Sequence, residues 1–194
     1  GLGRRIRALA SSVVDHIDLR SIAVPHLLRL AAELHATTFL SVYHNHSALC
    51  LERLHDMTGM AVHWWPIGGT LPFNIGGAPK LLLACQSDEE IDRALDGQLE
   101  RRTARAIVDP DRLRKHLSEI RQRGWEFAVD DVVIGVAALA VPVLDDEGRV
   151  VCALSMAGLT PQLVGKTQPV HLRRLLAAAS SVATELGFRR RQVP

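Results

Sequence analysis

The sequence predicts an α+β domain that is built around one antiparallel β-sheet. Helical periodicity marks both ends of the chain, and the strands expected between them follow one another in pairs. Paired strands joined by short turns form hairpins, which favours an antiparallel sheet over strand–helix–strand units. The strongest pair is formed by two apolar runs, Gly135–Leu144 and Arg149–Ala157, around the acidic turn at residues 145–148. Gly148 can adopt the positive φ that closes such a turn.

The central hairpin is predicted to be covered on both faces. Val, Leu and Ala fill nearly every position of its first strand, and a strand that is apolar on both sides has no face for water. We expect helices to pack on one face of the sheet, and we expect the sheet to enclose a space on its other face. Pro142 favours a bulge or an edge position. The small residues Ala137, Ala138 and Ala157 lie near Ser155 and leave room beside the sheet, although a plain core hairpin is the alternative.

Composition restricts the class of protein. The 194 residues, 47% of them hydrophobic and 23% charged, suffice for one sizeable core or two small ones. A net charge of +2 makes the chain a poor candidate for binding nucleic acid by itself. Cys50, Cys85 and Cys152 lie in or beside apolar runs without a C-x-x-C motif, which favours a reducing, cytoplasmic environment. We see no signal peptide and no apolar run of membrane-spanning length.

Two helices are expected before the first strand. Gly1–Asp15 places apolar side chains at helical spacing, behind arginines at positions 4, 5 and 7. Cations oppose the dipole at a helix N-terminus, so we expect this helix to continue upstream in a longer protein. Ser21–Leu34 predicts the second helix. The strands expected next are Thr37–Tyr43 and Ala48–Leu54, around the turn His44–Ser47, and a third at Met57–Trp65.

A glycine-rich loop precedes the next expected helix. Leu81, Leu82 and Leu83 indicate that helix, and its N-terminus is expected near residues 76–79. Pro79 suits a first helical turn, and glycines there expose backbone N–H groups that can receive an anion. The spacing matches neither a P-loop nor a dinucleotide-binding fingerprint, and a plain loop is the alternative. The remaining elements are expected at Ser87–Leu95, Asp109–Arg123, Trp125–Asp131 and Gln168–Leu186, with Gly124 and Gly187 ending two of the helices.

Five segments, taken in order, resemble the effector-binding domain of the IclR family of bacterial transcriptional regulators. The resemblance covers nearly the whole chain, and Thr103 and Asp109-Pro110 fit a further family segment loosely. The glycine motif of the family matches Gly68–Ala84, which keeps Gly68, Leu71, Pro72, Lys80, Leu83 and Ala84. The other matching segments are the lead-in Asp18–Ala31, the helix end Arg121–Trp125 and the two strands Ile134–Val143 and Gly148–Gly158.

The resemblance implies a GAF-like fold, in which N- and C-terminal helices pack on one face of an antiparallel sheet and a ligand pocket lies on the other. It implies a linker helix over residues 1–17, an effector-binding domain over residues 18–188 and a solvated tail over residues 189–194. A winged helix-turn-helix domain would precede the linker and make the contacts with DNA. The expected partners are therefore a small-molecule effector and further copies in a homodimer or homotetramer, with no cofactor, metal or membrane.

The resemblance also implies a pocket that is more apolar than in relatives that bind small oxo-acids. Those relatives hold the carboxylate of the acid on backbone N–H groups, here Gly77 and Ala78, and surround it with polar side chains. Of these side chains only Ser155 remains polar in this sequence. An unpaired buried charge is unfavourable, so we expect a larger apolar or aromatic effector, with a packed core and no ligand as the alternative. Polar residues of the family are replaced here by Ala128, Ala138 and Ala157. The family pattern is also lost at Ala137, Val132, Asn74 and Pro79. The expected apolar walls of the pocket are Met60, His63, Leu71, Val136, Leu154 and Met156.

A small cofactor-free enzyme is an alternative function. Cys152 or Ser155 could act as the nucleophile and His63 as the base, with Asp130-Asp131 nearby. No G-x-S-x-G elbow surrounds Ser155, however. The upstream sequence would separate a regulator from an enzyme.

A metal-dependent sensor is a further alternative. His44, His46, His55 and Cys50 lie on or beside the first expected hairpin, which would bring them close together. Their spacing matches no metal-binding motif, and solvated turn residues are the simpler interpretation.

Overall fold

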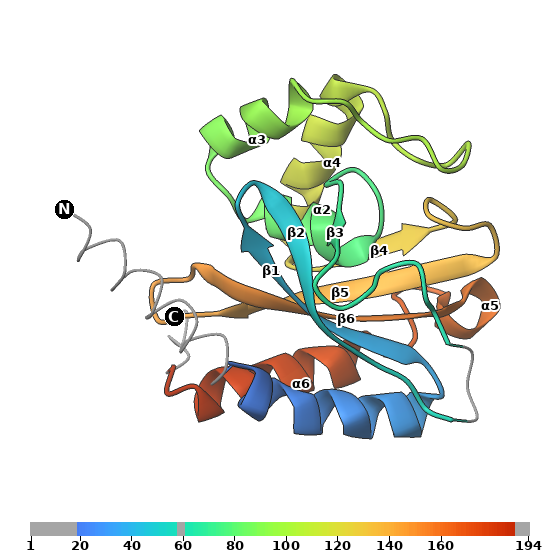
Figure 1. Ribbon diagram of the computed structural model, residues 1–194, viewed down its shortest axis with the longest axis vertical. Coiled ribbons are helices and arrows are strands. Elements are labelled where there is room, and N and C mark those ends of the chain that lie inside the picture. Colours follow the sequence, from blue (N-terminus) through green and yellow to red (C-terminus); the bar gives the residue numbers. More distant parts are fainter. Residues whose placement is uncertain (1–18, 58–60, 189–194) are drawn as a thin grey trace.

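The computed structural model describes residues 19–57 and 61–188. A six-stranded antiparallel sheet with the strand order β3-β2-β1-β6-β5-β4 runs through the domain, and helices cover both of its faces (Figure 1). The predicted α+β class is confirmed. The strands are β1 (Thr37–His44), β2 (Ser47–Leu54), β3 (Thr70–Leu71), β4 (Glu126–Val129), β5 (Val136–Leu144) and β6 (Val150–Leu159). The helices are one over residues 19–34, α2 (Gly77–Ala84), α3 (Asp88–Leu95), α4 (Pro110–Arg123), α5 (Thr160–Leu163) and α6 (Leu172–Glu185).

The helix over residues 19–34 and α6 lie side by side on one face of the sheet (Figure 1). Leu27 and Leu175 are fully buried there, in one cluster with Leu139 of β5. His26 Nε2 lies 2.8 Å from Glu185 Oε1 and joins the two helices. Each helix buries one apolar stripe, as amphipathic helices do. The predicted packing of the terminal helices on one face is therefore confirmed for the described residues.

Every second side chain of the central hairpin points into this same layer. Leu139 of β5 and Leu154 and Met156 of β6 are buried among the two helices. Strand residues alternate between faces, so Ser155 belongs to the opposite face. Of the expected apolar wall residues, Leu154 therefore belongs to the core, as strand alternation requires of some of them, whereas Met156 packs here and also borders the cavity described below.

Both predicted hairpin turns are present. Asn45 and His46 have φ values of 47° and 59°, and they join β1 to β2 in a two-residue turn. Such a pair of left-handed residues is typical of a type I′ turn, whose twist matches that of the flanking strands. In the turn between β5 and β6, Gly148 has a φ of 80° and its N–H donates to the carbonyl oxygen of Asp145 at 3.0 Å.

Pro142 occupies the kind of position that proline tolerates in a sheet. Strand β4 pairs with β5 only as far as Ala140, so Pro142 lies where β6 is the partner of β5. A register shift between Val143 and Leu144 follows directly. Proline has no N–H to donate, and at this edge position no neighbouring strand needs that donor. The bulge lies beside it.

Helix α2 lies on the other face, directly on the small residues of the central strands, and α3 and α4 pack beyond it (Figure 1). All eight residues of α2 are buried. A Cβ atom on Gly77 would lie 3.1 Å from the carbonyl oxygen of Ala138 and 3.4 Å from the Cβ of Ala140. The room that the small residues leave beside the sheet is therefore largely filled by α2.

The expected third strand at Met57–Trp65 is wrong for the described residues 61–65, which form no strand. The edge of β2 pairs instead with β3 and with the glycines before it. The N–H of Gly68 donates to the carbonyl oxygen of Cys50 at 2.8 Å, and the N–H of Cys50 donates to that of Gly69 at 3.0 Å. Strand pairing between distant segments thus decides which residues extend the sheet.

Other differences are small. Helix α6 begins at Leu172 rather than Gln168, because the φ of His171 is 151° and not helical. Cys85 is exposed, whereas the other two cysteines are buried, and all three thiols are free. The helix expected over residues 1–15 and the tail over residues 189–194 lie outside the described residues. None of the described helices is long and apolar enough to cross a membrane.

Candidate functional site

A cavity lies at the N-terminus of α2, between this helix and the central strands. The loop and first turn at residues 76–79 form one side of it, and Ala138, Ser155 and Ala157 of the sheet form another. Its volume is about 20 Å³, which is room for about one water molecule. Strands β5 and β6 thus bring small residues beneath the glycine-rich loop that the sequence singled out.

Helix α2 offers backbone donors to this cavity. Gly76 has a φ of 74°, and the helix begins at Gly77. The first N–H groups of a helix have no carbonyl partner within it, and no described side chain caps α2. The N–H groups of Gly77 and Ala78 are therefore donors at the cavity wall. Because the helix dipole adds positive potential there, the position suits an anionic group.

Aromatic and aliphatic side chains form the remaining walls. The rings of Phe39 and Trp65 stack with their centroids 5.9 Å apart and their planes 30° apart. Trp65 Nε1 donates to the carbonyl oxygen of Gly69 at 3.0 Å, which fixes the indole. Trp64 is half-buried, and Leu71 and Val132 complete the lining. A flat apolar group could pack against aromatic and aliphatic side chains here.

A buried charged network lies behind the glycine loop. The Oδ2 atom of Asp131 accepts the N–H of Gly76 at 3.0 Å and the Nζ of Lys80 at 2.8 Å. Lys80 Nζ also lies 2.9 Å from Glu126 Oε1. Lys80, Asp131 and Glu126 are all nearly inaccessible to water, so these contacts replace their hydration.

Further donors balance the charge of Glu126. Its carboxylate contacts His116 Nε2 at 2.8 Å and pairs with Arg123. Burial opposes ionisation of Glu126, but Lys80 and His116 outweigh it and lower the pKa of the carboxyl to about 2. Burial likewise opposes the charge on Lys80, yet its two carboxylate partners raise the pKa of the ammonium above its ordinary value. Helix α2, strand β4 and helix α4 are thereby joined through ionised side chains.

Six of the ten predicted site residues gather at the cavity: Gly77, Ala78, Leu71, Ala138, Ser155 and Ala157. Ala128 is buried on the same face and pairs with Ala138, but it does not line the cavity. Val136 is half-buried at the start of β5 and His63 is exposed, and neither lines it. Met60 lies outside the described residues.

Sequence reasoning missed the aromatic walls. Phe39, Trp64 and Trp65 line the cavity, although none of them was expected as a site residue. Val132, which was named only as a departure from the family pattern, lines it too. The two adjacent tryptophans carried a signal, because aromatic residues make up only 4% of the chain. Asn74, where the family pattern has His, is buried and bonds to the backbone of Glu100 instead.

The geometry opposes the enzyme alternative. Cys152 is fully buried on the face of helix α6, whereas Ser155 belongs to the opposite face. Burial raises the pKa of the Cys152 thiol, which disfavours the nucleophilic thiolate. His63 is exposed, and its ring packs edge-on against His55 with centroids 6.0 Å apart. The proposed nucleophiles and base are thus not brought together.

The candidate metal ligands have separate contacts. His46 Nδ1 lies 2.7 Å from Glu90 Oε2, and His44 Nε2 lies 3.0 Å from the side-chain amide of its neighbour. Burial raises the pKa of Cys50 to about 12, and its thiol donates to the carbonyl oxygen of Glu52 at 3.4 Å. Among residues 19–57 and 61–188, no three His, Cys, Asp or Glu side chains gather closely enough to hold a metal.

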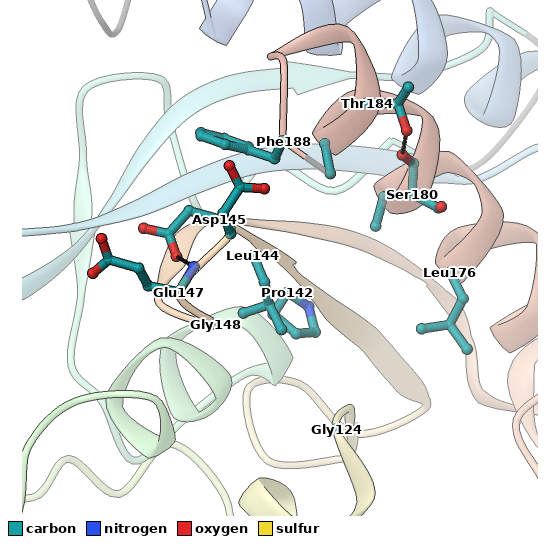
Figure 2. Close-up of a pocket in the computed structure, with 13 residues that line it drawn as sticks. Gly124, Pro142, Leu144, Asp145, Glu147, Gly148, Leu176, Ser180, Thr184 and Phe188 are labelled. Atoms are coloured by element: carbon teal, nitrogen blue, oxygen red, sulfur yellow. Dashed lines mark hydrogen bonds between the residues drawn. The ribbon is translucent and has the colours of Figure 1, made fainter. Parts of the chain in front are cut away.

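A larger hollow of about 460 Å³ lies between α6 and the turn that joins β5 to β6 (Figure 2). Leu144, Leu176 and Phe188 give it apolar walls. Its acidic rim is already occupied, because Asp145 accepts the backbone N–H of Arg149 at 2.9 Å and its Nε at 2.8 Å. Partial burial opposes ionisation of Asp145, but these bonds lower the pKa of the carboxyl. The N-terminus of α2 is the better candidate because it presents donors to its cavity.

Known proteins resemble this chain over most of its length. Residues 11–184 match the family model described as bacterial transcriptional regulator IclR C-terminal. The HTH-type transcriptional regulator XynR of Escherichia coli is 26% identical over 188 residues, which span 96% of this chain and 74% of XynR. The HTH-type transcriptional repressor AllR of the same species is 25% identical over 189 residues, which span 97% of this chain and 69% of AllR.

Solved structures share the fold. The transcriptional regulator YaiJ superposes with a TM-score of 0.81 at 26% identity, over 88% of this chain and 96% of the YaiJ chain. An IclR homolog from Microbacterium hydrocarbonoxydans, complexed with 4-hydroxybenzoate, superposes with a TM-score of 0.79 at 26% identity, over 89% of this chain and 69% of that one. The chain therefore belongs to the IclR family of bacterial transcriptional regulators, of which it forms the C-terminal domain.

Proposed function

We propose that this domain senses an aromatic carboxylic acid that binds at the N-terminus of α2. The observation that carries the proposal is a helix N-terminus without a described side-chain cap, beside a cavity with aromatic walls. The N–H groups of Gly77 and Ala78 and the hydroxyl of Ser155 would bind the carboxylate. Phe39 and Trp65 would contact the ring.

The composition of the walls favours a ring acid over a small oxo-acid. A small acid would place most of its polar atoms against Ala138 and Ala157, which can donate no side-chain hydrogen bond. A ring acid needs donors at one end only, and its ring can replace water at apolar surface. The complex of an IclR homolog with 4-hydroxybenzoate supports that compound as the first to test.

Binding requires the cavity to widen, because a volume of about 20 Å³ cannot hold a ring. The sheet and α2 leave little room for movement, since all eight residues of α2 are buried and β5 and β6 lie inside the sheet. We infer that the opening occurs at Trp64, which is half-buried on irregular backbone. A ligand that binds only the widened state would shift the population toward it.

We infer that the effector controls a winged helix-turn-helix domain in the whole regulator. Residues 1–17 would form the linker helix, residues 18–188 the effector-binding domain and residues 189–194 a tail. The HTH-type names of XynR and AllR support this, because this chain spans 74% and 69% of their lengths. We further infer a cytoplasmic homodimer or homotetramer without enzymatic activity, whose mass light scattering would determine.

Thermal shift measurements test the ligand class. A ligand that binds only the folded state raises the melting temperature with its concentration. We expect 4-hydroxybenzoate and other ring acids to do so, whereas glyoxylate and pyruvate should not. Ser155→Ala should lower the affinity for the ring acid by about tenfold, because one hydrogen bond to a charged group is lost.

The matched control is Ser118→Ala on the exposed face of α4, which should leave the affinity unchanged. Stabilisation by the small oxo-acids alone would contradict the proposal.

A further inference from the structure

The loop between β4 and β5 contains two adjacent aspartates that bond in different directions. Asp130 has a φ of 60°, and its Oδ1 accepts the N–H of Gly135 at 2.8 Å and the hydroxyl of Thr160 at 3.2 Å. Its carbonyl oxygen accepts the hydroxyl of Thr103 at 2.6 Å. These bonds fix the loop on both sides, so they also fix the place of Asp131.

Asp131 reaches the glycine loop with a single oxygen. Its Oδ2 accepts the N–H of Gly76, the residue before α2, and the Nζ of Lys80, which lies one turn into the helix. The residues between these two contacts include Gly77 and Ala78. We propose that Asp131 is a positioning residue that fixes the orientation of the Gly77 and Ala78 N–H groups for an effector carboxylate. This inference rests on the function proposed above.

Lys80 makes the arrangement compatible with an anionic effector. A carboxylate as close to the anchor as Asp131 would by itself repel a second carboxylate. Lys80 Nζ lies 2.8 Å from Asp131 and 2.9 Å from Glu126, and Arg123 pairs with Glu126. The positive charges of Lys80 and Arg123 thus oppose the negative charges of the two carboxylates. Removing Lys80 would leave an uncompensated carboxylate beside the helix N-terminus.

A purely structural role of the network makes different predictions. If Asp131 only stabilised the fold, its removal would lower the melting temperature and weaken charged and neutral ligands alike. A positioning role acts on acids selectively, because a neutral ligand depends less on the two N–H groups.

Backbone amide NMR tests the positioning without a ligand. In the 194-residue protein, Asp131→Ala should abolish the exchange protection of the Gly76 amide and shift the resonances of Gly77 and Ala78. Asp131→Asn keeps the volume and one acceptor oxygen, so these amides should stay close to wild type. Asp92→Ala, which breaks a surface pair with Arg114, is the control and should leave them unchanged.

The double variant Lys80→Met/Asp131→Leu guards against misfolding of Asp131→Ala. It removes both charges together, a change that buried ion pairs often tolerate, and it also removes the acceptor for Gly76. Its Gly76 amide should lose protection as well. Unchanged Gly76, Gly77 and Ala78 amides in either folded variant would overturn the proposal.

Calorimetric titration with 4-hydroxybenzoate and its neutral analogue 4-hydroxybenzamide gives a second readout. Asp131→Ala and Lys80→Met should each lower the affinity for the acid by about tenfold or more relative to the affinity for the amide, and Asp131→Asn should not. An equal loss for both ligands would indicate a structural role and overturn the inference. If the wild-type protein binds neither compound, the proposed ligand class fails, while the amide resonances still decide whether Asp131 positions the loop.

Discussion

Ala138 is the residue at which a binding cavity and a packed core differ most. Its side chain borders the cavity, and its carbonyl oxygen lies so close to Gly77 that a Cβ atom there would be 3.1 Å away. Because the cavity holds only about 20 Å³, Ala138→Phe must displace neighbours. We expect it to lower the free energy of unfolding by about 1–3 kcal/mol and to abolish effector binding. Urea denaturation and ligand titration measure the two effects.

The matched control is Ala138→Ser, which adds a single oxygen where phenylalanine adds a ring, so stability and binding of a ring acid should stay near wild type. If Ala138→Phe binds the effector as well as wild type does, the cavity is not the binding site. If it loses binding but keeps its stability, the cavity widens more readily than its size suggests.

Which residues face the cavity could be predicted only in part. The family resemblance pointed to Gly77, Ala78 and Ser155, and the glycine-rich loop before a helix agreed with it at the first two positions. The place of His63 depends on the path of an irregular segment, and no local pattern encodes that path. The sequence placed Asp131 only near the candidate nucleophile and base of the enzyme alternative, since its contact with Gly76 joins residues 55 positions apart.

At the scale of the element, α2 depends on its close approach to the sheet. A Cβ on Gly77 would lie 3.1 Å from the backbone oxygen of Ala138, which cannot move as a side chain can. We therefore expect Gly77→Ala to lower stability by about 1 kcal/mol or more, although alanine favours helices. The control is Gly97→Ala, whose Cβ would meet its nearest neighbour at 3.4 Å. Chemical denaturation of both variants is the measurement, and equal stabilities would refute the close packing.

Helices were easier to predict than strand partners. The side chain of Ser87 accepts the N–H of Glu90, Asp109 caps α4, and Gly124 ends it with a φ of 77°, all as the local sequence indicates. These signals lie within a few residues of the helix ends that they mark. The strand that was expected at residues 57–65 is absent from the described residues 61–65. Its prediction depended on which segment reaches the edge of β2, and pairing over such separations leaves no local trace.

At the scale of the whole molecule, the sheet separates two layers of different character. The layer of α6 and residues 19–34 is built from large aliphatic side chains, whereas α2 lies on small residues beside the cavity. The fold class could be predicted because hairpins and terminal helices suffice to define it. The filling of the second face by α2 could not, because it results from tertiary packing. Through Lys80 and Glu126, a shift of α2 would act first on β4 and α4.

The isolated 194-residue protein should not bind duplex DNA with sequence selectivity. Its net charge is only +2, and α4 is the described helix that is richest in arginine. Three of its four arginine side chains form ion pairs: Arg114 with Asp92, Arg121 with Asp88 and Arg123 with Glu126. A recognition helix needs side chains that are available to base edges in the major groove. In fluorescence anisotropy with operator-length duplexes we expect at most weak binding that disappears as salt rises, because phosphate contacts release counterions. A regulator that also contains the winged helix-turn-helix domain is the positive control, and a salt-resistant, sequence-selective complex of the isolated domain would contradict the division of labour proposed here.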